Sequence, residues 1–290
     1  FTFANLGFID TVPEPDKVYG TPYKIGKNAH STYGNLNGRV AEIFTFAERV
    51  PDEGRQKIET YLAIKYGITL GATSAEKDYV NSAGIKIWDV VANSGYNYNI
   101  AGIGKDQSSD LNQKQSKSIN DANEVTIGLG LIDVTNNANT NEFANDKDFL
   151  VWGCDNGAFT GTSTNTVTIA PEITTSLTRI NRKWKIVETG GDVENVFVGI
   201  PSTAFSGFTK TADEEYVLIV SDNGNFTDND IVDVIPLKIA STIYGITLDK
   251  DGSSSYQNWY DFDGTKYCTM GKSPNLSGNH AVNIAAGDYM

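Results

Sequence analysis

Apolar side chains follow two different periods in the first well-patterned stretch of the chain, residues 38–70. Residues 39–46 alternate with a period of two, and both faces carry apolar side chains. Such a pattern predicts a strand that is covered on both sides rather than one that lies half in water. The period then lengthens to three and four residues, which predicts an amphipathic helix.

The predicted helix has recognisable ends. Pro51 can begin it, and Gly67 can end it. Acidic residues in the first turn suit the positive end of the helix dipole. One face carries most of the apolar side chains, namely Ile58, Tyr61, Leu62 and Tyr66. We therefore expect this face to pack on the preceding sheet or on the following domain.

After the helix, the chain consists of short apolar runs separated by turn residues. The turns are rich in Asn, Asp, Gly, Ser and Thr. No further helical pattern is found, so the crossover helices that a parallel sheet needs are missing. The predicted fold class is therefore all-β, an antiparallel β-sandwich or a related architecture. The strand candidates are residues 98–104, 124–131, 148–153, 166–170, 181–189, 193–200, 215–221, 231–237 and 259–270.

Charge narrows the range of partners. The 290 residues carry 23 Lys and Arg against 36 Asp and Glu, a formal net charge of −13. Nucleic-acid binding needs clustered positive charge, so this balance argues against a nucleic-acid partner and against an anionic membrane surface. No apolar run reaches about 18 residues, so we expect no membrane-spanning segment. Phe1 is not a natural start, and we expect the chain to be a piece of something longer.

Two cysteines do not make a disulfide framework. Cys154 and Cys268 are far apart in the sequence and can pair only if their Cα atoms come within about 7 Å. Unpaired, partly buried thiols are the favoured interpretation, with a disulfide as the alternative. The only histidines are His30 and His280, and no Cys-x-x-Cys occurs, which disfavours a zinc site.

Acidic turns are the best candidates for a cation site. Side-chain oxygens follow one another at short spacing, as in a calcium loop, at Asp222, Asn223, Asn225, Asp228 and Asp230. Shorter Asp-x-Asp-Gly turns lie at residues 249–252 and 261–264. The same residue types also suit tight turns that bind nothing, and this second interpretation is favoured for all three segments. Ca²⁺ is thus the one cofactor that the sequence suggests.

Other polar patterns also have two interpretations. The segment 102–120 is either an exposed binding loop or, as we favour, a loop ordered by its own amide hydrogen bonds. One strand face is expected to hold an Arg–Glu pair beside a buried indole, formed by Arg182, Trp184 and Glu188. No nucleophile elbow, phosphate loop or catalytic triad is recognisable, so we do not expect an enzyme.

Several phrases together resemble a known arrangement of modules. GRVAEIFTF and RQKIETYLAIKYGITL resemble the closing strand and exit helix of concanavalin A-like, laminin-G-type jelly rolls in very large Bacteroidota surface proteins. EVTIGLGLIDVTNNANTNEF, DKDFLVWGCDNG, RINRKWKIVETG and YVLIVSDNGNF follow in the order of the uncharacterised β-rich module that comes after such lectin-like domains. DFDGTKYCTMG resembles the last strand of that module. The likeness covers residues 38–271.

The resemblance implies a division of the chain. Residues 1–50 would be the end of the lectin-like sandwich, residues 51–70 a linking helix, residues 71–271 the β-sandwich module, and residues 272–290 a linker or the start of a further module. The helix face described above would then be an inter-module interface. Cys154 and Cys268 depart from the pattern, because polar or aromatic residues are expected there.

The resemblance also implies a location and a role. It implies export, by the type IX route, to the cell surface, and a non-enzymatic structural or adhesive part in a long adhesin, including those of gliding cells. The partners would be neighbouring modules of the same chain and surface polysaccharide. A carbohydrate-binding module is the alternative, with sugars stacked on Trp88, Tyr96, Tyr98 or Tyr256. A fragment of a secreted glycoside hydrolase is a third.

Overall fold

The computed structural model describes residues 38, 40–71, 75–170, 173–246, 248–249, 256–257, 259–274 and 282–283. The chain divides into two compact units, residues 1–50 and residues 51–290. Most of the expected lectin-like part, like most of residues 272–290, lies outside the described residues.

The strand predicted at residues 39–46 is not found among the described residues of the first unit. Residues 40–46 have irregular backbone, and Val40, Ile43, Phe44 and Phe46 are each between 43% and 55% exposed. A strand needs partners for its N–H and C=O groups, and none of the described strands pairs with this segment. Alternating hydrophobicity alone therefore does not make a strand here.

The predicted helix is confirmed as α1 (Asp52–Tyr66). It follows Pro51, and Gly67 ends it with φ of 63° while donating a hydrogen bond to the carbonyl of Ala63. Its buried face differs from the predicted one, because it consists of Thr60, Ala63 and Ile64. Ile58, Tyr61, Leu62 and Tyr66 are half-buried, and of these Tyr61 packs against the same apolar cluster as Ala63 and Ile64.

The reason for this difference is local. Ala63 and Ile64 pack in a cluster with Trp88 and Phe149 on the outer face of the sheet. Thr60 belongs to the buried face because its hydroxyl accepts a hydrogen bond from the backbone N–H of Val80 at 3.0 Å. A polar residue is thus favoured at position 60, because the backbone N–H of Val80 would otherwise be buried without a hydrogen-bond partner.

Besides α1, the described part of the second unit consists of strands and two short 3-10 turns. The turns are η2 (Gln107–Ser109) and η3 (Ser202–Phe205). The described strands are β1 (Tyr79–Val80), β2 (Lys86–Trp88), β3 (Tyr98–Asp106), β4 (Leu111–Gln113), β5 (Gln115–Lys117), β6 (Thr126–Leu129), β7 (Phe149–Cys154), β8 (Ser163–Ala170), β9 (Ile173–Thr189), β10 (Asn195–Pro201), β11 (Glu214–Ser221), β12 (Ile231–Ala240), β13 (Ile243–Ile246), β14 (Leu248–Asp249), β15 (Tyr256–Gln257), β16 (Tyr260–Asp261), β17 (Thr265–Pro274) and β18 (Val282–Asn283).

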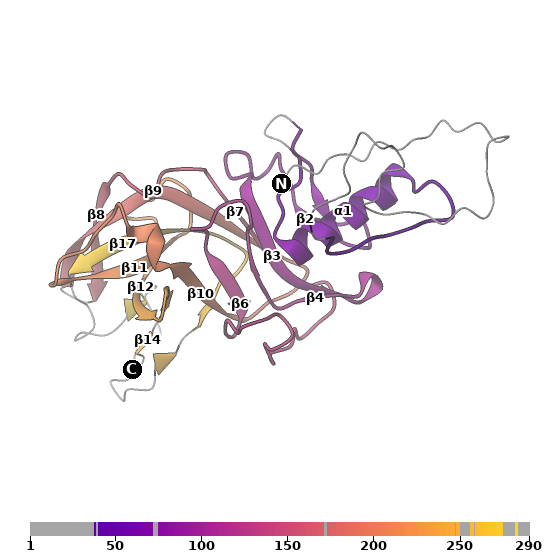
Figure 1. Cartoon of the computed structure of the whole chain (residues 1–290). Helices are drawn as coiled ribbons and strands as arrows, with labels where there is room; N and C mark the ends of the chain where they lie inside the picture. Colours follow the sequence, from indigo (N-terminus) through magenta and orange to yellow (C-terminus); the bar gives the residue numbers. More distant parts are fainter. Residues whose placement is uncertain are drawn as a thin grey trace. The chain divides into compact units, whose positions relative to one another are not determined.

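The large sheet curls until its two ends nearly meet. Its order is β4-β3-β7-β9-β17-β11-β12-β13-β10-β6-β5, and the described pairings within it are antiparallel. The end strands β4 and β5 are consecutive in the chain and are joined by Lys114. Figure 1 shows the strands curving around a common interior, with α1 beside β2 and β3. The predicted all-β, antiparallel fold is confirmed.

The polar segment 102–120 is part of this sheet, so its prediction as a loop is wrong. It contains most of β3 and all of β4 and β5, and it buries Gln113, Lys114 and Ser116. The side-chain amide of Gln113 donates to the carbonyl of Gln115 at 2.7 Å. Such hydrogen bonds make the burial of polar side chains tolerable, so hydrophobic periodicity could not reveal these strands.

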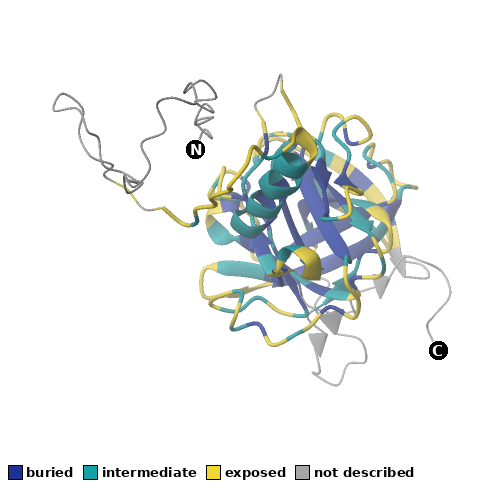
Figure 2. Cartoon of the chain, turned by 90° about the vertical axis from the view of Figure 1, so that its right-hand side faces the viewer, coloured by how far each residue is buried: buried dark blue, intermediate teal, exposed yellow. Residues whose placement is uncertain are grey.

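Two faces of the central strands are buried, which explains their apolar sequences. In β7, Leu150 and Trp152 point into the main core inside the sheet, while Phe149 and Val151 point outward to the cluster beneath α1. Successive side chains of a strand point to opposite faces, so a strand covered on both sides must be apolar throughout. Figure 2 shows α1 lying across these buried strands.

The two cysteines lie on either side of Trp184. Cys154 of β7 and Cys268 of β17 are each paired with Trp184 of β9, from opposite sides. Their Cα atoms are therefore two strand spacings apart, about 9.5 Å, which exceeds the reach of a disulfide. Both thiols are free, as favoured from the sequence, and fully buried rather than partly buried. Burial, followed by the nearby charge of Glu124, raises the pKa of Cys154 to about 12.

In the described part of the chain, none of the helices is long and apolar enough to cross a membrane.

Candidate functional site

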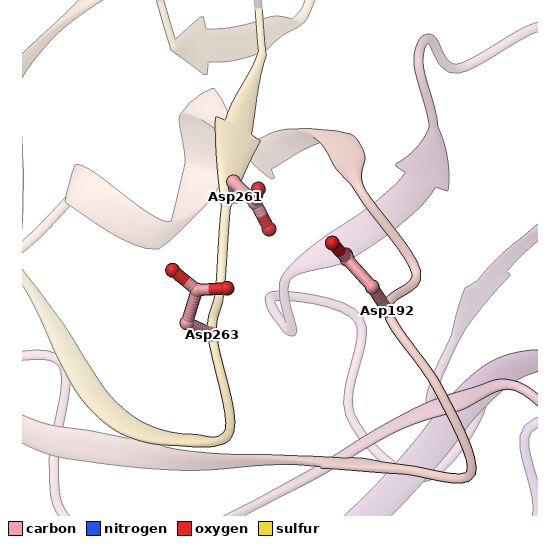
Figure 3. Close-up of side chains that lie close together, drawn as sticks. All are labelled: Asp192, Asp261 and Asp263. Carbon is pink, nitrogen blue, oxygen red and sulfur yellow. The ribbon is translucent and has the colours of Figure 1, made fainter.

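Three carboxylates gather where two turns of the sheet meet. Asp192 lies in the turn between β9 and β10, Asp261 ends β16, and Asp263 lies in the turn from β16 to β17. One carboxylate oxygen of each lies within 4.8 Å of the other two. Figure 3 shows Asp192 facing Asp261 and Asp263 across the gap between the two turns. We call these three residues the acidic cluster.

Strand pairing brings these distant residues together. Asp261 of β16 is paired with Asn195 of β10, which places it close to the turn that holds Asp192. Glu188 of β9 joins the two turns, because its carboxylate accepts hydrogen bonds from the backbone N–H of Val193 at 2.7 Å and of Gly264 at 3.1 Å. The acidic cluster is thus held by the main chain on both sides.

The cluster concentrates negative charge. Partial burial, followed by the charges of Asp192 and Asp263, raises the pKa of Asp261 to about 6. Burial likewise raises the pKa of Glu188, with Asp192 and Asp263 adding to the effect. The Oδ1 atom of Asp261 is buried and has no hydrogen-bond partner among the described residues. Several carboxylate oxygens at this spacing are the donor set that hard cations such as Ca²⁺ and Mg²⁺ prefer.

The sequence revealed part of this site. Asp261 and Asp263 belong to the predicted Asp-x-Asp-Gly turn at residues 261–264, whereas Asp192 was missed. No local signal places residue 192 beside residue 261, because only the pairing of β10 with β16 does so. The companion turn at residues 249–252 lies mostly outside the described residues.

The longer acidic turn at residues 222–230 is arranged differently. Asp222 accepts a hydrogen bond from Lys266 at 2.7 Å, and Asp228 accepts one from Asn165 at 2.9 Å. The other members cap nearby backbone: Asn223 accepts from the N–H of Asn225, and Asp230 accepts from the N–H of Thr227. These contacts orient four of the five side chains toward different partners, which supports the turn interpretation rather than a calcium loop.

The aromatic residues considered for sugar stacking are largely covered. Trp88 is 1% exposed, and its indole donates to the side chain of Asn97 at 2.9 Å, so it offers no face to a sugar. Tyr96 and Tyr98 are half-buried, and the Tyr96 ring packs edge-on against Tyr267 with centroids 5.4 Å apart. The side chain of Tyr256 lies outside the described residues.

A second group of charged residues is buried inside the sheet. Arg182 forms ion pairs with Glu124 and, at 3.1 Å, with Asp121. The indole of Trp184 donates to Glu124 at 2.6 Å. The predicted indole is therefore buried beside an Arg–Glu pair, but the predicted partner, Glu188, is wrong. Six residues of extended strand separate Arg182 from Glu188, about 20 Å, so side chains on the same face cannot meet.

This buried group is saturated with contacts. Glu124 also accepts a hydrogen bond from the side chain of Asn99 at 2.9 Å. The Arg182 guanidinium lies 4.2 Å from the centre of the Phe159 ring and donates to the carbonyl of Gly157 at 2.7 Å. Removal of one partner from a buried pair like this one would leave an uncompensated charge, so both partners are important for the packing around them.

Comparison with known proteins identifies a family but not an activity. Neither the curated proteins nor the solved structures gave a match to the chain. A family model described as a domain of unknown function, DUF8202, matches residues 54–253, more than half of the chain. The matched range begins in α1 and includes the turn that carries Asp192. The chain therefore belongs to the DUF8202 family.

Proposed function

We propose that the chain is a non-enzymatic structural or adhesive module of a large secreted cell-surface protein. The order of its sequence elements supports this role, because residues 38–271 resemble a module that follows lectin-like domains in long Bacteroidota adhesins. The proposal includes export to the cell surface and contact with neighbouring modules of the same polypeptide.

One structural observation carries the proposal most directly: the interior of the nearly closed sheet is filled. Trp152, Trp184, Phe205, Tyr216 and Met270 all belong to the main core and are at most 5% exposed. Sheets that bind ligands inside keep room for them, whereas a filled interior suits a rigid spacer. With α1 packed on its outer face, the unit that begins at Pro51 is suited to transmitting force between neighbours.

Antibodies against the purified chain test the location. Intact cells that produce the parent polypeptide are expected to be labelled as strongly as permeabilised cells, and mild protease treatment of intact cells should remove the label. Labelling that appears only after permeabilisation would contradict the proposal.

We further propose that the acidic cluster binds Ca²⁺ as a structural ion. The buried, unpartnered Oδ1 of Asp261 supports this, because a buried carboxylate oxygen without a hydrogen bond destabilises the fold unless something else neutralises it. An ion shared by Asp192, Asp261 and Asp263 would fasten the β9–β10 turn to β16.

Thermal unfolding in EDTA and in millimolar CaCl₂ tests this second proposal. The melting temperature should rise with Ca²⁺, because a ligand that binds only the folded state stabilises it. The rise should disappear in Asp261→Asn and remain in Asp222→Asn, which removes a carboxylate from the turn at residues 222–230. A rise that disappears in Asp222→Asn but remains in Asp261→Asn would place the Ca²⁺ site in the turn at residues 222–230. If the melting temperature of the unaltered chain does not rise, Ca²⁺ binding is excluded at both places.

A further inference from the structure

A polar groove lies between the end of α1 and the strands that close the sheet. Its volume is about 320 Å³. Lys65 and Tyr66 contribute from the last turn of α1, Gln113 and Gln115 from β4 and β5, and Lys117 from the end of β5. Small-molecule sites typically have volumes of about 300–1,000 Å³, so this groove suits a ligand of one or two rings.

We propose that this groove binds an acidic saccharide, with the carboxylate of the sugar between Lys65 and Lys117. The inference goes beyond the proposed structural role and does not depend on it. It differs from sugar stacking on Trp88, Tyr96 or Tyr98, because those residues do not line this groove.

The polar wall of the groove is oriented in advance by hydrogen bonds. The side chain of Gln115 exchanges two hydrogen bonds with the backbone of Asp133, each of 2.8 Å. Gln113 donates its amide N–H to the carbonyl of Gln115, and this hydrogen bond fixes the direction of the Gln113 side-chain oxygen. Fixed amide groups lose little freedom when they bind, and they match the hydroxyl groups of a sugar ring as donors and acceptors.

Strand geometry places a second set of groups on the same side. Gln115 and Lys117 are two residues apart in β5 and therefore point to the same face of the sheet. Thr126 of β6 is paired directly with Lys117 and also lines the groove. Tyr66 of α1 also lines the groove, and the apolar face of an aromatic ring can cover the C–H groups of a sugar. Hydroxyl, amide and aromatic groups therefore surround the same space.

The two ammonium groups determine the preferred charge of the ligand. Lys65 lines the groove, and its ammonium donates to the hydroxyl of Tyr61 and lies 4.8 Å from the centre of the Tyr61 ring and 5.7 Å from that of Tyr66. Lys117 donates to the carbonyl of Ala122 and has no ion pair to any described carboxylate within 4.0 Å. Burial lowers the pKa of Lys117 even though the charges of Glu124 and Asp121 act in the opposite direction, so an anionic ligand would offset the remaining cost of keeping it charged.

Titration of the full chain with a matched pair of sugars tests the inference. Methyl glucuronide and methyl glucoside differ only in the carboxylate, and binding is followed by chemical shifts of the backbone amides. The glucuronide should saturate shifts at the groove residues, and the glucoside should bind about tenfold more weakly or not measurably, since a charge-assisted hydrogen bond is lost.

Lysine variants assign the effect to the groove. Lys65→Gln and Lys117→Gln should each weaken glucuronide binding by about tenfold, whereas Lys57→Gln, which removes a lysine paired with Glu53 on the same helix, should leave it unchanged. Unfolding curves check that all three variants remain folded. Equal binding of the two sugars, shifts confined to other residues, or equal losses in all three variants would each overturn the inference.

Discussion

The guanidinium of Arg182 donates a hydrogen bond to the carboxylate of Glu124, which lies 58 residues earlier in the sequence. The Arg182 side chain is 7% exposed and that of Glu124 is fully buried. The same carboxylate accepts further hydrogen bonds from the side chains of Trp184 and Asn99. The pair therefore fixes the segment before β6 against β9 at the interior of the sheet.

Removal of one partner should be much more damaging than removal of both. Arg182→Met leaves the buried carboxylate of Glu124 without its counter-ion, and we expect a loss of about 3–5 kcal/mol in the free energy of unfolding. The double variant Glu124→Leu/Arg182→Met should lose less than Arg182→Met alone, because no buried charge remains unpaired. Urea unfolding measures both. A loss below about 1 kcal/mol in Arg182→Met would contradict the role given to the pair.

The acidic cluster should make stability depend on pH. The pKa of Asp261 in the folded protein, about 6, is above its value of about 3.9 in an unfolded chain, so the folded state binds the proton more tightly. In EDTA, the contribution of Asp261 to the free energy of unfolding should therefore decrease as the pH rises from about 4 to 6 and remain lower above pH 6. The raised pKa of Glu188 acts in the same direction.

Comparison with a variant isolates the contribution of Asp261. In EDTA at pH 7, Asp261→Asn should be more stable than the unaltered chain and should show a smaller dependence on pH. Asp222→Asn serves as the control, because Asp222 is exposed and paired with Lys266. Denaturant unfolding at several pH values provides the measurement. An unchanged pH profile in Asp261→Asn would show that repulsion between the carboxylates of the acidic cluster does not affect stability.

Two isoleucines of α1 distinguish the buried face from the predicted one. Ile64 is fully buried against the sheet, and Ile64→Ala should lower the free energy of unfolding by about 2–5 kcal/mol. Ile58 is half-buried, so Ile58→Ala should have a clearly smaller effect on the unit that begins at Pro51. Thermal or urea unfolding compares the two. Equal losses would mean that Ile58 packs on the sheet as tightly as Ile64.

Hydrophobic pattern predicted the strands whose side chains fill the core. Each of the nine strand candidates overlaps an observed strand. The positions of these strands that face the interior are occupied by apolar residues such as Trp152, Leu218 and Ile235, which produce the pattern. The pattern failed for β4 and β5, which close the sheet with polar side chains such as Gln113 and Ser116. Their burial is made tolerable by hydrogen bonds that a sequence does not display.

The candidate site could be predicted only in its local part. Asp261 and Asp263 are two residues apart and form a recognisable turn, but Asp192 joins them through the long-range pairing of β10 with β16. The buried face of α1 was missed for a related reason. Thr60 is buried because a backbone N–H of β1 needs its hydroxyl, and helical periodicity ranks residues by apolarity alone.

A pair of glycines tests whether α1 and β5 are in close contact. Gly67 and Gly264 have similar left-handed φ angles of 63° and 67°. A Cβ at Gly67 would lie 2.0 Å from the carbonyl oxygen of Lys117, whereas a Cβ at Gly264 would have no atom within 4 Å. Both alanine variants should lose about 1–2 kcal/mol for the left-handed backbone, and Gly67→Ala should lose substantially more. Urea unfolding of the two variants should separate them, and equal losses would place β5 farther from the helix.

Attachment of living cells tests the structural and adhesive role most directly. Cells whose parent polypeptide lacks residues 51–274 are compared under flow with cells that carry the full polypeptide, with growth on simple and polymeric sugars as the control. A structural or adhesive module predicts a several-fold loss of attachment with unchanged growth on both carbon sources. Unchanged attachment, together with loss of growth on a polysaccharide, would contradict this role and indicate a degradative enzyme.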